Sequence, residues 1–502
     1  MTGGKRFGEA ILESMPFAER WIDLGVIVAY LAGITWFGAR FRSSQRSLKD
    51  YFLGGKTVPW WAIALSIVSA ETSTVTVIGT PALSFQGNFG FLQLVLGYLL
   101  ARLVIAALFL PAYFRGELFT AYELIRRRFG ERTRRLCAAT FLVLRALAEG
   151  VRVFAISIVI SVVLGTGQMT SIAAILCLTL FYTLEGGMTA VIWTDVVQMV
   201  LAVGGAALSL SAILNQIPGG WNHVVSLAAP LGKFQVFDFR LASPAAFFSR
   251  TYSFWGGVLG GCFLATASHG TEQLMVQRLL AARGERESRI ALLSSWLVIA
   301  CQFTLFLVIG VCLFALYSDR HWATPAVPDS IYPQFVWTYL PKGVAGLVTA
   351  AILAAAMSNL SAALNSLSST TIMDFLRPLA SPDVKEETWL RRARSSTFIW
   401  GVVLFGVALL ARNWGSVLQA GLSIASVLYG SLLGVFLLGV LTRRVGESSA
   451  IVAMIAGLAV MIYVRFGTSI AFTWYVLIGT ATTFVVGLVA SWFLEKHAGQ
   501  SA

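Results

Sequence analysis

A stretch of polar residues interrupts an apolar segment near the start of the chain. The segment spans residues 58–84, and its middle, residues 69–74, reads SAETST. Polar groups at bilayer depth are costly unless they face protein or a water-filled cavity. A helix interrupted there exposes backbone carbonyls and half-helix ends, which can bind ions and small solutes. An unbroken helix with back-bonded hydroxyls is the alternative, but the carboxylate favours a binding role for Ser69, Glu71 and Thr72.

Three charged residues lie within the apolar segment 136–164. Arg145, Glu149 and Arg152 are spaced by four and three residues, which places them on one face of a helix. They could form a self-neutralising cluster that fixes helix packing. They could equally line a solute cavity, where an arginine binds a carboxylate through two hydrogen bonds. The sequence leaves both interpretations open; Glu149 and Arg152 are the candidate solute contacts, and Arg145 is expected to be structural.

A single carboxylate lies in the apolar segment 189–213. Asp195 has no basic neighbour in the sequence, and Gln198 lies one turn away. An unpaired carboxylate inside a membrane is typical of a cation ligand or a proton site, although it could also cap a helix end. We therefore take Asp195 as a candidate cation ligand.

The segment 245–270 repeats the features of the first one. It is rich in glycine and ends with Ser268 and His269 before a basic loop. Because it would cross the membrane in the direction opposite to 58–84, a second interrupted helix is predicted. Ser268 and His269 are candidate solute contacts, although a lone histidine is more often a packed polar group.

The segment 340–372 is the most polar of the apolar segments. Ser358, Asn359 and Ser361 follow a run of alanines in its C-terminal half. Small residues let helices pack closely, and this alone could explain the pattern. Side-chain oxygens at this spacing, facing an interrupted helix, would also suit a hard monovalent cation.

The composition indicates a polytopic membrane protein. Of the 502 residues, 57% are hydrophobic and 12% are charged, and a soluble domain this apolar would precipitate. The net charge of +13 comes from Lys and Arg gathered in alternate loops, so it indicates topology and not nucleic-acid binding. This pattern predicts a multi-pass protein of the cell (inner) membrane with its N-terminus outside and its C-terminus in the cytoplasm. About thirteen segments could span a bilayer: 22–38, 58–84, 90–114, 136–164, 170–186, 189–213, 245–270, 290–317, 340–372, 396–411, 415–440, 448–464 and 471–495.

The two interrupted segments divide the chain into two halves. Each is followed by four further spans, which is the pattern of a five-plus-five inverted repeat. The expected fold class is therefore an all-α integral membrane protein with a broken first helix in each repeat. The predicted division is an N-terminal segment with one extra helix (1–57), a first repeat (58–214), a second repeat (245–441) and two C-terminal helices (447–502).

Five motifs together resemble the sodium/solute symporter family, which includes bacterial sialic acid symporters and animal iodide carriers. The resemblance extends from about residue 50 to residue 440 and keeps the family's order. It implies a LeuT-type fold and sodium-coupled import of a small organic solute by alternating access. The motifs are YFLGGKTVPWWAIALSIVSAET, GGMTAVIWTDVVQ, EQLMVQRLLAA, AAAMSNLSAALNSLSSTTIMDF and YGSLLGVFLLG.

The resemblance also implies ligands for the co-transported sodium ion, between the first and eighth core helices. The family usually has Ser or Thr where this chain has Asn359, although an amide oxygen can still bind a hard cation. A second sodium ion, bound by some members, would use Asp195, Ser358 and Ser361, but the next serine of that set is Ala362 here. The implied principal ligands are the carbonyls of Leu65, Val68 and Ala355 and the side chains of Ser358 and Asn359.

For the solute, the resemblance favours a carboxylate-bearing or zwitterionic molecule over a sugar. The polar residues that hold sugar in the family's galactose symporter are not matched here. In the family's sialic acid symporter, an arginine binds the carboxylate of the solute. Near the matching position, this chain has Glu149, with Arg152 one turn further along.

Other functions have less support. Proton coupling through Asp195 or Glu149 is the alternative within transport. A membrane sensor would need a soluble extension, and the chain ends at Ala502 soon after the last predicted span. An enzyme is not expected, because no metal-ligand spacing, nucleotide loop or nucleophile constellation is found. The expected partners are the solute, the sodium ion and the lipid bilayer, with no nucleic acid and no obligate protein partner.

Overall fold

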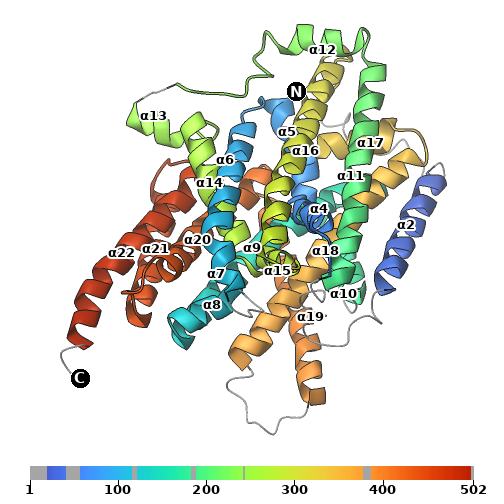
Figure 1. The fold of residues 1–502 in the computed structure, drawn as a ribbon. Helices are drawn as coiled ribbons and strands as arrows, with labels where there is room; N and C mark the ends of the chain where they lie inside the picture. Colours follow the sequence, from blue (N-terminus) through green and yellow to red (C-terminus); the bar gives the residue numbers. More distant parts are fainter. Residues whose placement is uncertain are drawn as a thin grey trace.

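The computed structural model describes residues 20–40, 57–115, 121–182, 188–240, 243–376 and 386–498. Helices account for most of these residues, and no β-strand occurs among them (Figure 1). Seven of the described helices are long and apolar enough to cross a membrane, or eight when one bent pair counts as a single span. The all-α membrane fold is thus confirmed, whereas the total of thirteen spans stays a prediction.

The first interrupted helix is present as predicted. It consists of α4 (Trp60–Glu71) and α5 (Thr74–Gln86), which are bent by 64° at the break. Thr72 closes the end of α4, because its backbone N–H and its hydroxyl both donate to the carbonyl of Val68, at 2.8 and 2.7 Å. The polar stretch therefore ends one helix and starts the next inside the protein, where neighbouring helices cover it.

The second interrupted helix starts later than predicted. The segment 245–270 holds two helices, the short α13 (Pro244–Ser249) and then α14 (Phe254–Gly270). The chain breaks at Thr271 and Glu272 and resumes as α15 (Gln273–Leu280). Only four residues, 250–253, separate α13 from α14, and the prediction from the sequence placed them inside one continuous apolar segment.

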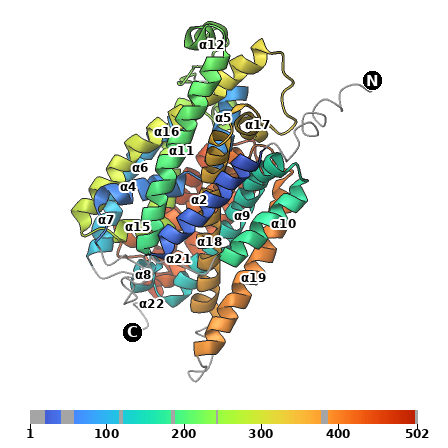
Figure 2. The same ribbon diagram turned by 90° about the vertical axis from the view of Figure 1, so that its right-hand side faces the viewer.

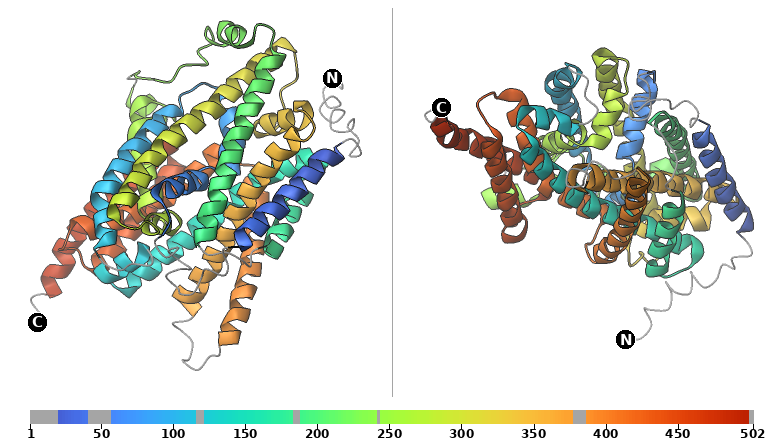
Figure 3. Two further views of the ribbon diagram at one scale, coloured as in Figure 1. Left: turned by 45° about the vertical axis from the view of Figure 1, so that its right-hand side comes forward. Right: turned by 90° about the horizontal axis from the view of Figure 1, so that it is seen from below.

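The other helices surround the two breaks. The accessory helix α2 and the C-terminal helices α21 and α22 lie on opposite sides of the molecule (Figures 1 and 3). In Figure 2, α2 lies in front of α18 and beside α11. The remaining elements are α2 (Trp21–Ala39), α6 (Leu92–Val104), η4 (Ile105–Phe109), α7 (Leu110–Phe114), α8 (Ala121–Arg128), α9 (Glu131–Leu164), α10 (Gln168–Tyr182), α11 (Met188–Gln216), α12 (Gly220–Ala228), α16 (Glu285–Asp319), η5 (Pro328–Ser330), α17 (Ile331–Tyr339), α18 (Val344–Thr370), η6 (Thr371–Leu376), α19 (Glu386–Ala411), α20 (Val417–Leu441), α21 (Glu447–Gly467), η8 (Phe472–Trp474) and α22 (Tyr475–Ala498).

A buried carboxylate joins the segment between α16 and α17 to the start of α20. Asp329 of η5 accepts a hydrogen bond from the backbone N–H of Val417, at the start of α20, at 3.1 Å. Burial raises the pKa of Asp329 to about 6, and the hydrogen bond from Val417 opposes that shift. The contact holds the segment between α16 and α17 against α5 and the start of α20.

Helices α6 and α14 are in backbone contact along a line of glycines. A Cβ atom on Gly97 would overlap the carbonyl oxygen of Val258, and one on Gly261 would overlap that of Leu94. Close approach of this kind requires residues without a side chain, and it is common between membrane helices. The glycines of the segment 245–270 therefore serve packing, and they bring α14 close enough to α6 for His269 and Arg102 to reach the same carboxylate.

The glycine contact leads to a stability prediction. Replacing Gly97 by Val should force α6 away from α14, because the new side chain would meet backbone atoms that cannot move independently. Overpacking typically costs about 1–3 kcal/mol, so the melting temperature of the purified protein should fall by several degrees. Gly204→Val is the matched control, since Gly204 lies within α11 with no atom near its Cβ position. An equal melting temperature for both variants would contradict the packing assignment.

Candidate solute and sodium site

A cavity lies where the two helix breaks meet. It encloses about 1050 Å³, including its open mouth, between α4, α5, α6, α9, α14, α15, α16 and α20. Of the seven predicted solute contacts, four line it: Glu71, Arg152, Ser268 and His269. Its other polar lining residues are Ser73, Thr76, Tyr98, Arg145, Glu272 and Tyr429.

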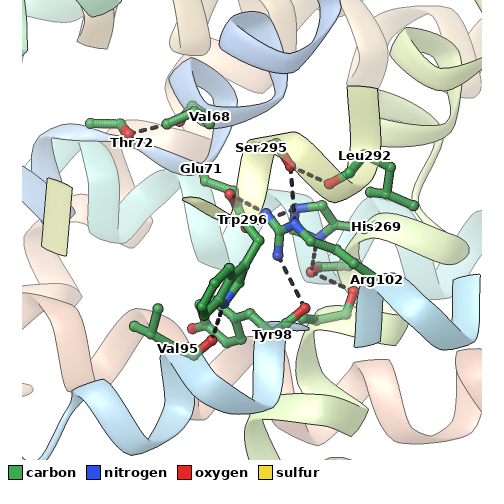
Figure 4. A network of polar contacts seen from close by, with 12 residues as sticks. Val68, Glu71, Thr72, Val95, Tyr98, Arg102, His269, Leu292, Ser295 and Trp296 are labelled. Atoms are coloured by element: carbon green, nitrogen blue, oxygen red, sulfur yellow. Dashed lines mark hydrogen bonds and ion pairs between the residues drawn. The ribbon is translucent and has the colours of Figure 1, made fainter. Parts of the chain in front are cut away.

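The first polar cluster in the cavity is centred on Glu71, the last residue of α4 (Figure 4). One carboxylate oxygen, Oε2, lies 2.8 Å from Nη2 of Arg102. Arg102 is fully buried; its Nε donates to the hydroxyl of Ser295 at 3.0 Å and its Nη1 to the carbonyl of Tyr98 at 3.3 Å. The cluster therefore ties the end of α4 to α6 and α16. A charged residue within an apolar span signals a buried partner, but the sequence does not reveal that Glu71 is the partner of Arg102.

His269 connects the second helix break to the first. Its Nε2 lies 2.8 Å from Oε1 of Glu71, although the N–H direction does not fit a hydrogen bond. Its Nδ1 lies 2.8 Å from the hydroxyl of Ser268. The imidazole is buried, so His269 is more than an isolated packed polar group. It brings the ends of α4 and α14 together at one carboxylate.

The second cluster contains the three charged residues predicted to share a face of α9, and it confirms that geometry. Oε1 of Glu149 lies 3.1 Å from Nη2 of Arg145 and 2.6 Å from Nη1 of Arg152. Nη1 of Arg145 also lies 2.8 Å from Oε1 of Glu272, whose second oxygen accepts a hydrogen bond from Tyr429. The sequence did not reveal Glu272 or Tyr429, because both lie far from α9 along the chain.

Two residues of this cluster differ in their access to the cavity. Glu149 is fully buried, does not line the cavity and pairs with two arginines, so its role as a solute contact stays a prediction. Arg145 lines the cavity and forms two buried ion pairs, which is consistent with the structural role expected for it. The helical spacing gave the face of α9 correctly, but it could not show how deeply each side chain on that face is covered.

Arg152 differs from its neighbours in exposure and in the number of its partners. Its side chain is 27% exposed, against 5% for Arg145. It uses Nη1 for Glu149, and the described residues provide no hydrogen-bond partner for Nε and Nη2. A guanidinium with two remaining donors in a cavity can bind a carboxylate through paired hydrogen bonds.

Asp195 has a basic partner, contrary to the premise drawn from the sequence. Its Oδ2 lies 3.0 Å from Nη2 of Arg278, on α15, and accepts a hydrogen bond from the hydroxyl of Ser66 at 2.6 Å. Nε of Arg278 donates to the same hydroxyl at 2.9 Å. The interaction is buried and ties α11 to α4 and α15, so the carboxylate is not the unpaired group that the sequence suggested.

Two further predicted solute contacts, Ser69 and Thr72, lie outside the central cavity. Ser69 and Thr72 line a smaller cavity of about 450 Å³ between the first helix break, α11, α17 and α18. The hydroxyl of Thr72 lies 2.9 Å from Oε1 of Gln302. Ser69 and Thr72 therefore do not share the cavity of Arg152, because they lie on the opposite side of the helix break.

The predicted sodium ligands are only partly described by the structure. The carbonyl of Val68 already accepts the two hydrogen bonds from Thr72, and Leu65 is partly buried in α4. Asn359 of α18 is buried and lines a cavity of about 240 Å³ together with Arg152. The side chains of Ala355, Ser358 and Ser361 lie outside the described part of the structure. The ligand sets for both sodium ions therefore stay predictions.

The helical architecture and the central polar cavity define a polytopic membrane transporter. Residues 51–457 match the sequence model of the Sodium:solute symporter family. The chain belongs to this family, as its motifs indicated, and it has the LeuT-type fold that the resemblance implied.

Individual proteins show the same relationship. A sodium/sialic acid symporter of Proteus mirabilis is 27% identical over 94% of this chain and 95% of its own. Sodium-coupled monocarboxylate transporter 1 of Mus musculus is 30% identical, over 85% of this chain and 69% of its own. The solved substrate-bound, outward-open structure of a Na⁺-coupled sialic acid symporter superposes with a TM-score of 0.81 at 26% identity, covering 94% of this chain and 97% of the other.

The pairing of Glu71 with Arg102 leads to a second stability prediction. Arg102→Gln should leave the carboxylate of Glu71 buried without its cation, which typically costs about 3–5 kcal/mol. The melting temperature and the yield of folded protein should both fall. The double variant Glu71→Gln with Arg102→Gln removes both charges and should recover part of the loss, as a double-mutant cycle would measure. If the two single effects simply add, the two residues do not interact.

Proposed function

We propose that the protein imports a small monocarboxylate together with sodium, and that Arg152 binds the carboxylate of the solute. The partly exposed guanidinium of Arg152, with two donors left over in the central cavity, carries this proposal. The names of two relatives, a sialic acid symporter and a monocarboxylate transporter, both refer to organic acids. A carboxylate substrate is therefore consistent with the relatives and with the chemistry of the cavity.

The charge balance favours a monoanion over a zwitterion. Arg145 and Arg152 are balanced by Glu149 and Glu272, so this cluster is neutral before any ligand binds. A bound sodium ion would add one positive charge, and one solute carboxylate would cancel it, which lowers the cost of burying either ion alone. An ammonium group on the solute would need a free carboxylate, but Glu71 and Glu272 each already have a cationic partner.

The rest of the lining favours a largely apolar solute body. Phe91, Phe303 and Leu422 form part of the wall, and the hydroxyls of Ser73 and Thr76 provide a few polar contacts. Pockets with this composition orient a ligand by one or two polar groups and bury its remainder against apolar surface. A compact hydroxylated or alkyl carboxylate fits this description better than a sugar with many hydroxyl groups.

For sodium, the proposal keeps the ligands implied by the family resemblance: the carbonyls of Leu65, Val68 and Ala355 with the side chains of Ser358 and Asn359. A small cavity lies between Asn359 and Arg152, so the cation and the solute carboxylate would be neighbours. A second sodium site at Asp195 and Ser361 has weaker support, because Arg278 already neutralises Asp195. Proton coupling through Asp195 or Glu149 is not favoured, since both carboxylates are paired with arginines and the relatives are sodium-coupled by name.

The protein would lie in the cell (inner) membrane with its N-terminus outside, as the basic loops indicate. The repeats 58–214 and 245–441 would move relative to each other to open the cavity alternately to each side. No bond in the solute would be made or broken, so the protein would be a transporter and not an enzyme.

Sodium dependence is the first test of this function. Proteoliposomes should take up a radiolabelled short monocarboxylate such as lactate or pyruvate only when sodium is higher outside. The physical reason is that the cation supplies both the driving gradient and the charge that the carboxylate cancels. Potassium and choline, at constant pH and membrane potential, are the matched controls. Equal uptake with choline would disprove sodium coupling.

Arg152 provides the second test. Arg152→Gln should raise the solute concentration for half-maximal uptake by about tenfold or more, because a charge-assisted hydrogen bond contributes roughly 1.5–3 kcal/mol. The melting temperature should change little, since Glu149 keeps its pairing with Arg145. Arg152→Lys retains the charge but not the two-pronged geometry, so it should give an intermediate affinity. An unchanged affinity in Arg152→Gln would remove this residue from the solute site.

A further inference from the structure

The accessory helix α2 binds the start of α18 through a buried carboxylate. Asp23 is fully buried in the first turn of α2. Its Oδ1 accepts hydrogen bonds from the backbone N–H groups of Gly343 and Gly346, at 2.7 and 2.8 Å. These N–H groups lie at the N-terminus of α18, where no earlier turn of the helix can accept their hydrogen bonds. A residue from outside the ten core helices therefore caps a core helix.

The contact extends to the joint between α17 and α18. Arg20 donates from Nη1 to Oδ2 of Asp23 at 3.0 Å and from Nη2 to the carbonyl of Thr338, near the end of α17, at 3.2 Å. Gly343, between the two helices, has a φ of +87°, a backbone conformation that favours glycine. Arg20, which precedes α2, and Asp23, in its first turn, thus contact both α17 and α18.

The two helices are also in direct backbone contact at this point. A Cβ atom on Gly346 would lie 2.6 Å from both the Cα and the carbonyl oxygen of Asp23. The N-terminus of α18 therefore cannot shift along its axis or rotate without displacing α2 or breaking the two hydrogen bonds. The contact therefore fixes the N-terminal end of α18 against α2.

We propose that Asp23 is a positioning residue for sodium binding, acting through α18. This inference rests on the proposed function, which places sodium ligands on α18 at Ser358 and Asn359. These residues follow the capped end by about four turns of one helix, so a change at the N-terminus moves them relative to the carbonyls of α4. When only a fraction of molecules holds α18 in the sodium-competent position, the apparent sodium affinity falls by that fraction.

The effect should appear in sodium affinity and not in maximal rate. Asp23→Ala removes the acceptor of both hydrogen bonds, and the loss of a helix cap corresponds to about a fivefold change in an equilibrium. The sodium concentration for half-maximal uptake should therefore rise, by at most about fivefold, since it scales with the inverse of the competent fraction. The maximal rate per folded transporter should stay close to that of the original protein, because saturating sodium restores the competent state by mass action.

The control variants distinguish loss of the cap from loss of the Arg20–Asp23 ion pair and from any other change in α2. Asp23→Asn combined with Arg20→Gln keeps an oxygen acceptor for α18 without either charge, and it should retain near-normal sodium affinity. Tyr30→Phe alters another residue of α2 whose hydroxyl has no hydrogen-bond partner among the described residues, and it should have no effect. Gly346→Ala should also raise the half-maximal sodium concentration, because its Cβ would push α18 away from the backbone of Asp23. It replaces Asp23→Ala in the test if that variant does not fold.

The experiment uses sodium titrations of uptake in proteoliposomes, with the amount of folded transporter measured for each variant. Unchanged half-maximal sodium concentrations in both Asp23→Ala and Gly346→Ala would overturn the proposal. A lower maximal rate with unchanged sodium affinity would also overturn it, since that result indicates a purely structural role. If the original protein itself shows no sodium dependence, the proposed function fails instead, and the two failures are thereby distinguished.

Discussion

At the point where α4 ends, the carboxylate of Glu71 meets the buried guanidinium of Arg102 and the imidazole of His269. A broken helix at bilayer depth leaves backbone groups and a charge that lipid cannot accommodate. The protein resolves this by placing the break of α14 beside the break of α4, so that each polar segment is covered by the other and by α6. The glycines between α6 and α14 are part of the same solution, because without that close approach Arg102 and His269 could not share one carboxylate.

The charged side chains of the cavity neutralise one another in ion pairs, and one of them is also partly exposed. Glu149 and Glu272 balance Arg145 and Arg152, and outside the cavity Asp195 balances Arg278 in the same way. Taking these ions out of water is costly, and the cost is offset only where the geometry and the remaining hydrogen bonds are good. Among the described charged residues that line the cavity, Arg152 has the most exposed side chain, at 27%. A neutral cavity with one available guanidinium suits a solute anion that arrives with a cation, which links substrate chemistry to sodium coupling.

Helices outside the core contribute to the same arrangement. The core helix α18 is held at its N-terminus by α2, through a carboxylate that is as deeply buried as any in the cavity. The first span can thus be regarded as part of the functional unit and not only as an added membrane anchor. Because α18 also packs against α9, which lines the central cavity, it lies between that cavity and the accessory helix.

The sequence by itself determined the membrane class, the two interrupted helices, and the alignment of Arg145, Glu149 and Arg152 on one helix face. These follow from composition, from polar residues within apolar segments and from the helical period, all of which are local properties. The family followed from motifs distributed along the chain. Only the tertiary structure decided which charges pair: Glu71 with Arg102, Arg145 with Glu272, and Asp195 with Arg278. These partners are separated by long stretches of chain, and a single sequence carries no local signal of such contacts. For the same reason the burial of Glu149 and the capping of α18 by Asp23 could not be predicted, since both depend on how helices distant in sequence pack together.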